Sequence, residues 1–304
     1  MRLARLQQLL VLGWLAAFVA ACVLPWRAGH PLLALAAAAG VLGAHAVWLG
    51  VSFGLMRWHN RSDPAPPASW GDWLSAWWGE VRAAPLVFGW RQPFRSLAEP
   101  DFVPADARGR TGVVLVHGFV CNRGLWTPWL TQLRRAGVPF VAVDLEPVFG
   151  SIDDYVPIIE AAVVRLEQAT GERPLLVGHS MGGLAIRAWL AARQADARVR
   201  GIVTIGTPHR GTWLANFAHL GINARQMKPG GDWLQALEAA EPPSRSRLFH
   251  CIYGHGDNIV FPASNALLPG ASGQHVPGTA HIELVHRSEV MAALWQALGI
   301  PAPT

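Results

Sequence analysis

The chain is poor in cysteine and in lysine. Its three cysteines, at positions 22, 121 and 251 of 304 residues, are too few and too far apart for a disulfide framework or a zinc site, so we expect free thiols. Its 25 basic residues comprise 24 arginines and a single lysine, and they are scattered along the sequence. No basic run interleaved with aromatic residues occurs, which argues against a nucleic-acid partner.

Charge is almost absent from the first fifth of the chain. Between residues 6 and 56 the only acidic or basic side chain is Arg27. Two apolar segments, Leu6–Pro25 and Pro31–Met56, are each long enough to cross a hydrocarbon layer of about 30 Å. The connection of four residues that ends at His30 is too short for a soluble loop of any content. Residues 1–61 therefore predict a transmembrane helical hairpin.

The distribution of arginines predicts how this hairpin is oriented. Arg2 and Arg5 precede the first segment, Arg57 and Arg61 follow the second, and Arg27 lies between them. Because basic residues concentrate on the cytoplasmic side, both ends are expected in the cytoplasm, together with everything that follows residue 61. The lipid bilayer is thus an expected partner.

Two other interpretations of the N-terminus stay open. Met1–Arg5 followed by an apolar segment resembles a secretory signal, and Val19-Ala-Ala-Cys22 resembles the cleavage site of a lipoprotein. The residues after Cys22 remain apolar, which favours the hairpin. Whether the first segment is cleaved or lipidated is left open.

Residues 62–93 predict a linker and an amphipathic helix. The linker Asp63-Pro-Ala-Pro-Pro67 is rich in proline, and Ser69 is a candidate N-cap for a helix over residues 70–83. The apolar side chains of that helix recur at helical spacing, at Trp70, Trp73, Leu74, Trp77, Trp78 and Val81. Such a face either packs on a folded domain or lies on the surface of a bilayer.

From residue 94 to the end, strand and helix patterns alternate. Short Val/Ile/Leu-rich runs occur at 112–117, 140–144, 174–178, 199–205 and 248–253, with a weaker one at 274–276. Helical patterns occur at 126–135, 153–169, 181–193 and 288–298. The alternation predicts an α/β domain over 94–304, with a mostly parallel sheet and helices on both faces. In such a sheet, active residues gather where the strands end at their carboxyl edge.

Ser180 is the candidate nucleophile. It stands in Gly178-His-Ser-Met-Gly182, between an apolar strand pattern and a helical one, which is the setting of a nucleophile elbow. The flanking glycines have a steric purpose, because a turn that lifts the hydroxyl clear of the backbone leaves no room for bulky neighbours.

A serine nucleophile needs a base and an acid that orients it. His281 follows the weak last strand, and Asp257 follows the strand 248–253 through a glycine-rich turn. The order Ser, Asp, His is the one expected for this arrangement. The rival acids fit less well, because Glu283 is only two residues from His281 and Asp232 lies in an insertion.

Acyl transfer also needs donors for the oxyanion. The backbone N–H of Met181, directly after the nucleophile, is one candidate. The second is the backbone N–H of Phe119, in the loop after strand 112–117, where Gly118 allows close approach.

These motifs together resemble the α/β-hydrolase superfamily, and bacterial lipases and carboxylesterases in particular. The resemblance covers residues 112–298 and rests on His117-Gly118-Phe119, Gly178–Gly183, Gly206-Thr-Pro-His-Arg-Gly-Thr212 and Gly278-Thr-Ala-His281. It implies Ser180, Asp257 and His281 as the triad, with Phe119 and Met181 as oxyanion donors and no cofactor. Some similar secreted lipases bind calcium near the histidine. Residues 258–280 contain no acidic side chain, so we expect no metal site here.

The sequence therefore predicts a membrane-anchored serine hydrolase, in a bacterial inner membrane, that cleaves lipophilic carboxylic esters. An insertion over residues 212–247 carries apolar residues at helical spacing, and we expect it to form a lid. The same triad would serve an acyltransferase or a thioesterase. A non-enzymatic membrane scaffold is the third possibility, although such proteins usually lose a triad residue.

Overall fold

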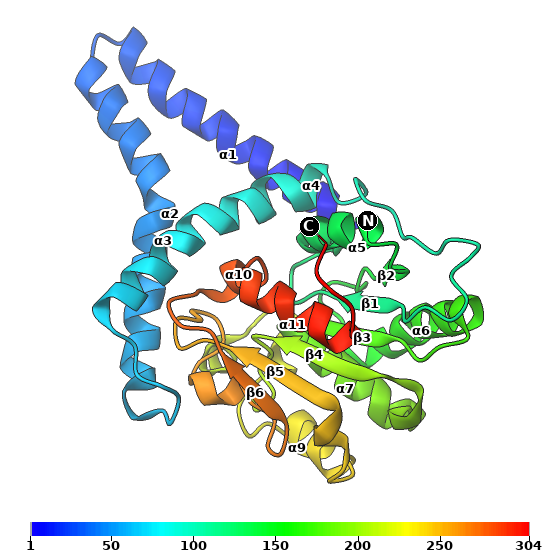
Figure 1. The fold of residues 1–304 in the computed structure, drawn as a ribbon. Helices are drawn as coiled ribbons and strands as arrows, with labels where there is room; N and C mark the ends of the chain where they lie inside the picture. The colour runs from blue at the N-terminus through cyan, green and yellow to red at the C-terminus, as the bar shows by residue number, and fades with distance from the viewer. Residues whose placement is uncertain (1, 304) are drawn as a thin grey trace.

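A single parallel sheet organises the part of the chain from residue 94 onward (Figure 1). The structure is a computed structural model that describes residues 2–303. Six strands lie in the order β2-β1-β3-β4-β5-β6, and every adjacent pair is parallel. Their bounds are β1 Val113–Val116, β2 Phe140–Ala142, β3 Leu175–His179, β4 Gly201–Ile205, β5 Phe249–Tyr253 and β6 Ser272–His275. All six lie within or next to the predicted runs.

Both faces of the sheet are covered, as its continuous apolar strands require. On one face pack α6 (Val156–Thr170), α7 (Met181–Arg193) and α9 (Asp232–Ala239), around Val114, Leu176 and Ile202. On the other face pack α5 (Thr127–Arg135), α10 (His281–Leu284) and α11 (Ser288–Leu298), around Val113, Leu175 and Val203. Alternate residues of each strand thus enter opposite cores.

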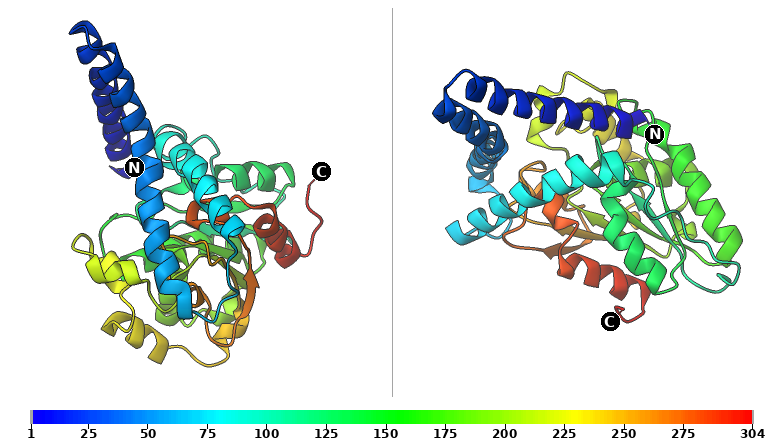
Figure 2. Two further views of the ribbon diagram at one scale, coloured as in Figure 1. Left: turned by 90° about the vertical axis from the view of Figure 1, so that its left-hand side faces the viewer. Right: turned by 90° about the horizontal axis from the view of Figure 1, so that it is seen from above.

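Two long helices form the N-terminal hairpin. Helix α1 (Arg2–Arg27) and helix α2 (Pro31–His59) meet at a short turn and stand away from the rest of the molecule (Figures 1 and 2). Their mean hydropathies of 2.2 and 2.0 make both of them candidate membrane spans by length and composition. Apart from Ala34 near the turn, their buried residues lie at the ends nearest the sheet: Leu3, Ala4 and Gln7 of α1 and Leu49, Phe53 and Met56 of α2. We call these two buried ends the feet of the hairpin.

Helix α3 (Trp70–Leu86) begins where Ser69 predicts it, because the Ser69 hydroxyl accepts the N–H of Asp72 at 3.1 Å. Beyond Ala83 it continues into a π-helical turn, Val87–Arg91, and a short helix α4 (Gln92–Phe94). Its buried side chains are Ala76 and Glu80, next to Gly79. Of the predicted apolar face, Trp73 and Trp77 pack beside the foot of α2, whereas Trp70, Leu74 and Trp78 are exposed.

The insertion between β4 and β5 has two parts. Helix α9 packs against α7 through Leu234 and Leu237, which belong to the main core. The part before it, consisting of the 3₁₀ segment η6 (Trp213–Phe217) and α8 (Ile222–Gln226), leaves Phe217, Leu220 and Ile222 exposed. Only this first part has the exposed apolar surface expected of a lid. The remaining short 3₁₀ segments are Asn60–Ser62, Arg123–Trp126, Ile152–Tyr155, Asp196–Arg198, Arg245–Leu248 and Ala263–Ala266.

Candidate active site

Ser180 lies in a sharp turn between β3 and α7. Its φ of 54° and ψ of −130° belong to a region that non-glycine residues rarely occupy. Its N–H donates to the carbonyl of Ile205 on β4 at 2.9 Å, which ties the turn to the neighbouring strand. A Cβ at Gly182 would overlap the carbonyl oxygens at the end of β1, and a Cβ at Gly178 would lie 2.7 Å from the backbone nitrogen of Gly183. The tight turn at Ser180 and its close packing against the end of β1 therefore require glycine at both positions.

Asp257 and His281 form a buried hydrogen-bonded pair. His281 Nδ1 donates to Asp257 Oδ2 at 2.7 Å, and the two residues are 4% and 2% exposed. The other carboxylate oxygen, Oδ1, accepts the N–H groups of Ile259 at 2.9 Å and Val260 at 2.8 Å. A carboxylate held in this way fixes the proton on Nδ1 and leaves the lone pair of His281 on Nε2.

The environment of His281 favours its charged form. Burial alone lowers its pKa, but the Asp257 carboxylate and a second acid, Glu80, outweigh burial and leave the pKa above its usual value. A histidine with this balance accepts a proton readily.

Ser180 lies beside this pair, on the same edge of the sheet. The ring of His179, which precedes the serine, is 4.6 Å from the ring of His281 between centroids. Gly206 follows β4 and lies against the pair, because a Cβ there would be 2.8 Å from Asp257 Oδ2 and 3.2 Å from His281 Nδ1. Within residues 2–303 no hydrogen bond joins the Ser180 hydroxyl to His281. Such contacts often tighten only when substrate binds.

The loop after β1 approaches the serine closely. A Cβ at Gly118 would lie 2.7 Å from Ser180 Cβ and 3.3 Å from its hydroxyl oxygen, so only glycine fits there. Phe119 follows in the loop, and Met181 opens α7, whose first N–H groups are free of helical partners. The positive end of the α7 dipole also points at this position. Both predicted oxyanion donors therefore belong to backbone that flanks Ser180.

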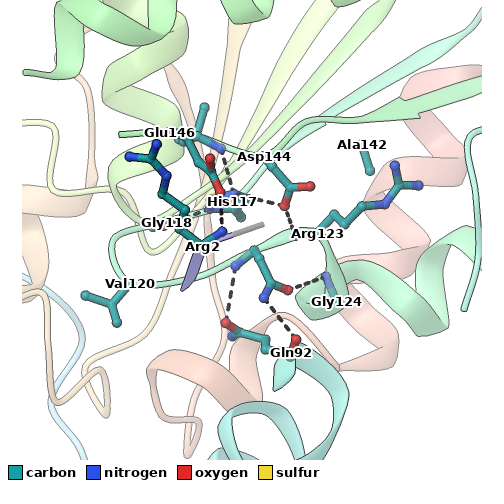
Figure 3. Close-up of polar contacts among 12 residues, drawn as sticks. Arg2, Gln92, His117, Gly118, Val120, Arg123, Gly124, Ala142, Asp144 and Glu146 are labelled. Atoms are coloured by element: carbon teal, nitrogen blue, oxygen red, sulfur yellow. Dashed lines mark hydrogen bonds and ion pairs between the residues drawn. The ribbon is translucent and has the colours of Figure 1, made fainter. Parts of the chain in front are cut away.

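The ring of His117 links this loop to the residues after β2 through two hydrogen bonds. Its Nε2 accepts the N–H of Leu145 at 3.0 Å, so the proton is on Nδ1, which donates to the carbonyl of Gly118 at 2.9 Å. Figure 3 shows His117 beside Gly118, with Asp144 on its other side and Arg123 bonded to Asp144. Because burial lowers the pKa of His117, the ring is neutral and acts as a fixed link.

A buried amide cluster holds the same loop to the foot of α1, and the sequence did not indicate it. Gln7 Nε2 donates to Gln92 Oε1 at 2.9 Å and to the carbonyl of Val120 at 3.4 Å. Asn122 Nδ2 donates to Gln7 Oε1 at 3.3 Å and to the carbonyl of Gln92 at 3.0 Å. Val120 has a φ of 53°, so the loop is held in a strained conformation. Gln7 and Gln8 are adjacent in the sequence, and no motif distinguishes the one that contacts the loop from the one that does not.

We expect Gln7→Leu to weaken this cluster and with it the oxyanion loop. The substitution keeps the size of the side chain but leaves buried amide groups without partners. For a soluble ester, kcat should fall about tenfold with KM nearly unchanged. The matched control is Gln8→Leu, because Gln8 donates instead to the carbonyl of Pro93, outside the loop. Equal kcat values for the two variants would contradict the link between Gln7 and the loop.

The cysteines near the site are not candidate nucleophiles. Burial raises the pKa of the Cys121 thiol to about 12 and also raises the pKa of Cys251. Both therefore stay protonated at neutral pH, and a thiol is a poor nucleophile in that form. Among residues 2–303, no three histidine, cysteine or acidic side chains gather in a way that could hold a metal ion.

An apolar strip leads away from the site on the side of the oxyanion loop. The ring of Phe119 is 5.9 Å from that of Phe149, and the carbonyl of Phe149 accepts the N–H of Ile222 at 3.1 Å. Phe149, Leu220 and Ile222 are all exposed. We call these three residues, together with Phe119, the apolar strip. An acyl chain is the kind of group that such a surface would contact.

Comparison with known proteins agrees with the fold and the motifs. Over 132 residues the chain is 35% identical to the triacylglycerol lipase of Burkholderia plantarii, a match that spans 40% of this chain and 36% of that protein. The mature lipase BlEst2 of Bacillus licheniformis superposes with a TM-score of 0.56 at 19% identity, over 65% of this chain and 96% of that one. Lipase B of Aspergillus fumigatus gives 0.56 at 18%, over 69% and 58%. These two likenesses concern the fold.

A family model settles the relationship. It matches residues 113–269, from β1 to the turn before β6, which is more than half of the chain. The matched part contains the elbow at Ser180 and the acid Asp257, and it stops short of His281. The chain belongs to the alpha/beta hydrolase family.

Proposed function

We propose that the protein is a serine hydrolase that cleaves lipophilic carboxylic esters through an acyl-enzyme at Ser180. The observation that carries the proposal is the buried Asp257–His281 pair, which lies beside a serine held in a strained elbow. Strain of this kind persists where the surrounding structure pays for it, and it is common at reacting atoms.

The first half of the reaction transfers the acyl group to the enzyme. Ser180 Oγ attacks the ester carbonyl carbon while His281 Nε2 takes the hydroxyl proton. Asp257 keeps the ring oriented and stabilises the imidazolium that forms. The carbonyl oxygen becomes an oxyanion, which accepts hydrogen bonds from the backbone N–H groups of Phe119 and Met181. This half is complete when the carbon–oxygen bond to the alcohol breaks and His281 gives its proton to the departing oxygen.

The second half releases the acid. Water enters, loses a proton to His281 Nε2 and attacks the acyl carbon. The acid leaves as Ser180 recovers its proton. An alcohol or thiol in the place of water would give acyl transfer, so product analysis distinguishes the two outcomes.

We place this chemistry at a membrane. Beyond the two feet, the apolar surfaces of α1 and α2 are exposed, and leucines such as Leu9, Leu32 and Leu42 are more than half accessible. A hairpin that crosses the bilayer would cover them with lipid. The arginines at both feet would then lie on the cytoplasmic side together with the sheet. A signal sequence has a similar composition, but the foot of α1 supports the retained hairpin through the contacts of Gln7.

We assign a different role to each of three parts of the chain. Residues 1–61 anchor the protein, residues 62–93 connect, and residues 94–304 form the catalytic domain with a lid that we place within 212–247. Of that insertion, we assign the moving part to the segment from Trp213 to Gln226, because α9 is fixed in the core. The apolar strip borders this segment and supports an acyl chain as the bound group.

Covalent labelling tests the function directly. The full chain in detergent is treated with a fluorophosphonate probe, and the modified peptide is identified by mass spectrometry. We expect a single modification, on Ser180, and faster hydrolysis of p-nitrophenyl octanoate than of the acetate. A native protein that takes no label, or that takes it on another residue, would disprove the proposed mechanism. Heat-denatured protein is the control for non-specific reaction.

A further inference from the structure

Glu80 is a buried acid that the proposed reaction does not use. It lies on α3, outside the strand-and-helix region, and is 3% exposed. Its carboxylate accepts the N–H of Ile282 at 3.1 and 3.3 Å and the N–H of Glu283 at 3.1 Å. Within residues 2–303 it forms no ion pair with an arginine or with the single lysine. Burying a carboxylate without a nearby cation costs free energy, so the hydrogen bonds that stabilise Glu80 need an explanation.

Those partners are the first turn of α10, which His281 opens. The N–H groups at the start of a helix have no partners within it, and Glu80 supplies an acceptor for two of them. Gly79 lets the two helices come this close, because a Cβ there would overlap the Glu283 carboxyl group. The first turn of α10, which carries His281, is thereby held in place from α3.

The charges around Glu80 couple it to His281. Burial raises the pKa of Glu80 to about 7, and His281 is the largest influence in the opposite direction. In return, Glu80 is one of the groups that raise the pKa of His281. The other titratable groups nearby are Asp257 after β5, His179 on β3 and Glu283 on α10. Arg82 on α3 and Arg287 after α10 act on Glu283.

We propose that Glu80 is a positioning residue for His281, which holds the first turn of α10 and, in its ionised form, adds a second negative charge near the imidazolium. This inference rests on the proposed function, because it assigns a task to the base of that reaction. Glu80 touches no reacting atom and acts through the backbone and the field at His281.

The helix that carries Glu80 also contacts the hairpin. Trp77 Nε1 donates to the carbonyl of Ala46 on α2 at 3.0 Å, and the ring of Trp73 meets that of Phe53 edge-on at 6.4 Å. Helix α3 therefore has the foot of α2 on one side and the turn of His281 on the other. Helix α3 thus supports the turn that carries His281, and the hairpin in turn supports α3.

The test compares Glu80→Gln with Glu283→Gln in the full chain. Glutamine preserves the shape of Glu80 and removes its charge. We expect kcat for p-nitrophenyl butyrate to fall about tenfold with little change in KM. The acid limb of the kcat/KM profile should move to lower pH by about half a unit, because loss of a nearby negative charge lowers the pKa of His281. Glu283→Gln removes an acid from the same turn and should leave both quantities at their wild-type values.

A second readout does not depend on activity. The pH titration of the His281 ring, followed by NMR, should show a lower midpoint in Glu80→Gln and an unchanged one in Glu283→Gln. Thermal unfolding of each variant establishes that it is folded. A folded Glu80→Gln with the wild-type midpoint and wild-type kcat would overturn the inference, as would equal effects of the two variants. If wild-type protein hydrolyses no ester and takes no probe, the proposed function fails instead, while the NMR comparison still decides the role of Glu80.

Discussion

Replacing Ser180 by alanine is expected to lower kcat for p-nitrophenyl esters by about 10⁶-fold. The change removes the only atom that can form the acyl-enzyme, so what remains is the rate at which bound ester meets water. The rest of the site is preserved, because alanine can occupy the same turn and the hydroxyl makes no hydrogen bond to His281. KM should change little. Steady-state rates with a short-chain and a long-chain ester measure the effect.

A second serine variant shows that the loss is specific. Ser75 lies on the exposed side of α3, and Ser75→Ala should retain wild-type kcat and probe labelling. Both variants should unfold at nearly the wild-type temperature. Should Ser180→Ala keep more than about one per cent of the wild-type kcat, a mechanism through this hydroxyl could not be maintained.

Asp257→Asn is expected to lower kcat by about 10⁴-fold, the second largest effect. In the native protein Oδ1 accepts two backbone N–H groups, and Oδ2 accepts the proton of His281 Nδ1. Asparagine keeps its oxygen on the two backbone donors and therefore turns its NH₂ group toward the ring. That group can only donate, so His281 must carry its proton on Nε2. A ring in this tautomer cannot take the proton of Ser180.

The two acids that the sequence offered as rivals are the matched controls. Asp232 begins α9 and is exposed, and the carboxyl of Glu283 lies against Gly79 of α3, so neither faces His281 Nδ1. Asp232→Asn and Glu283→Gln should therefore keep kcat within about twofold of wild type. A loss at either position as large as that at Asp257 would assign the acid differently.

Much of the fold could be predicted because its signals are local. Strands β1 to β5 are short apolar runs bounded by turns, and each formed where its pattern indicated. The elbow could be found because tight backbone geometry admits only glycine at Gly178 and Gly182. Even the weak strand β6 was detectable from its place before His281. In each case one stretch of sequence carries enough information to fix its own structure.

The supports of the site could not be predicted, because they come from residues far away in the sequence. Gln7 meets Val120 across 113 positions, and Glu80 meets Ile282 across 202. Neither residue belongs to a motif. The spacing of tryptophans on α3 also did not indicate that Ala76 and Glu80 would be its buried side chains. Helical periodicity identifies an apolar face but does not identify which side meets the core.

The foot of α1 also has a consequence for the order in which the protein is assembled. Synthesis proceeds from the N-terminus, so α1 is complete long before its partners exist: Gln92 follows Gln7 by 85 residues, and Glu146 follows Arg2, whose N–H it accepts at 3.0 Å, by 144 (Figure 3). Contacts over such separations close large loops and form late. During synthesis, Gln7 therefore has no hydrogen-bond partner in the loop until the first strands have folded beside α1. The oxyanion loop therefore reaches its final conformation only after residues 92–122 have packed against the foot of α1, which is synthesised first.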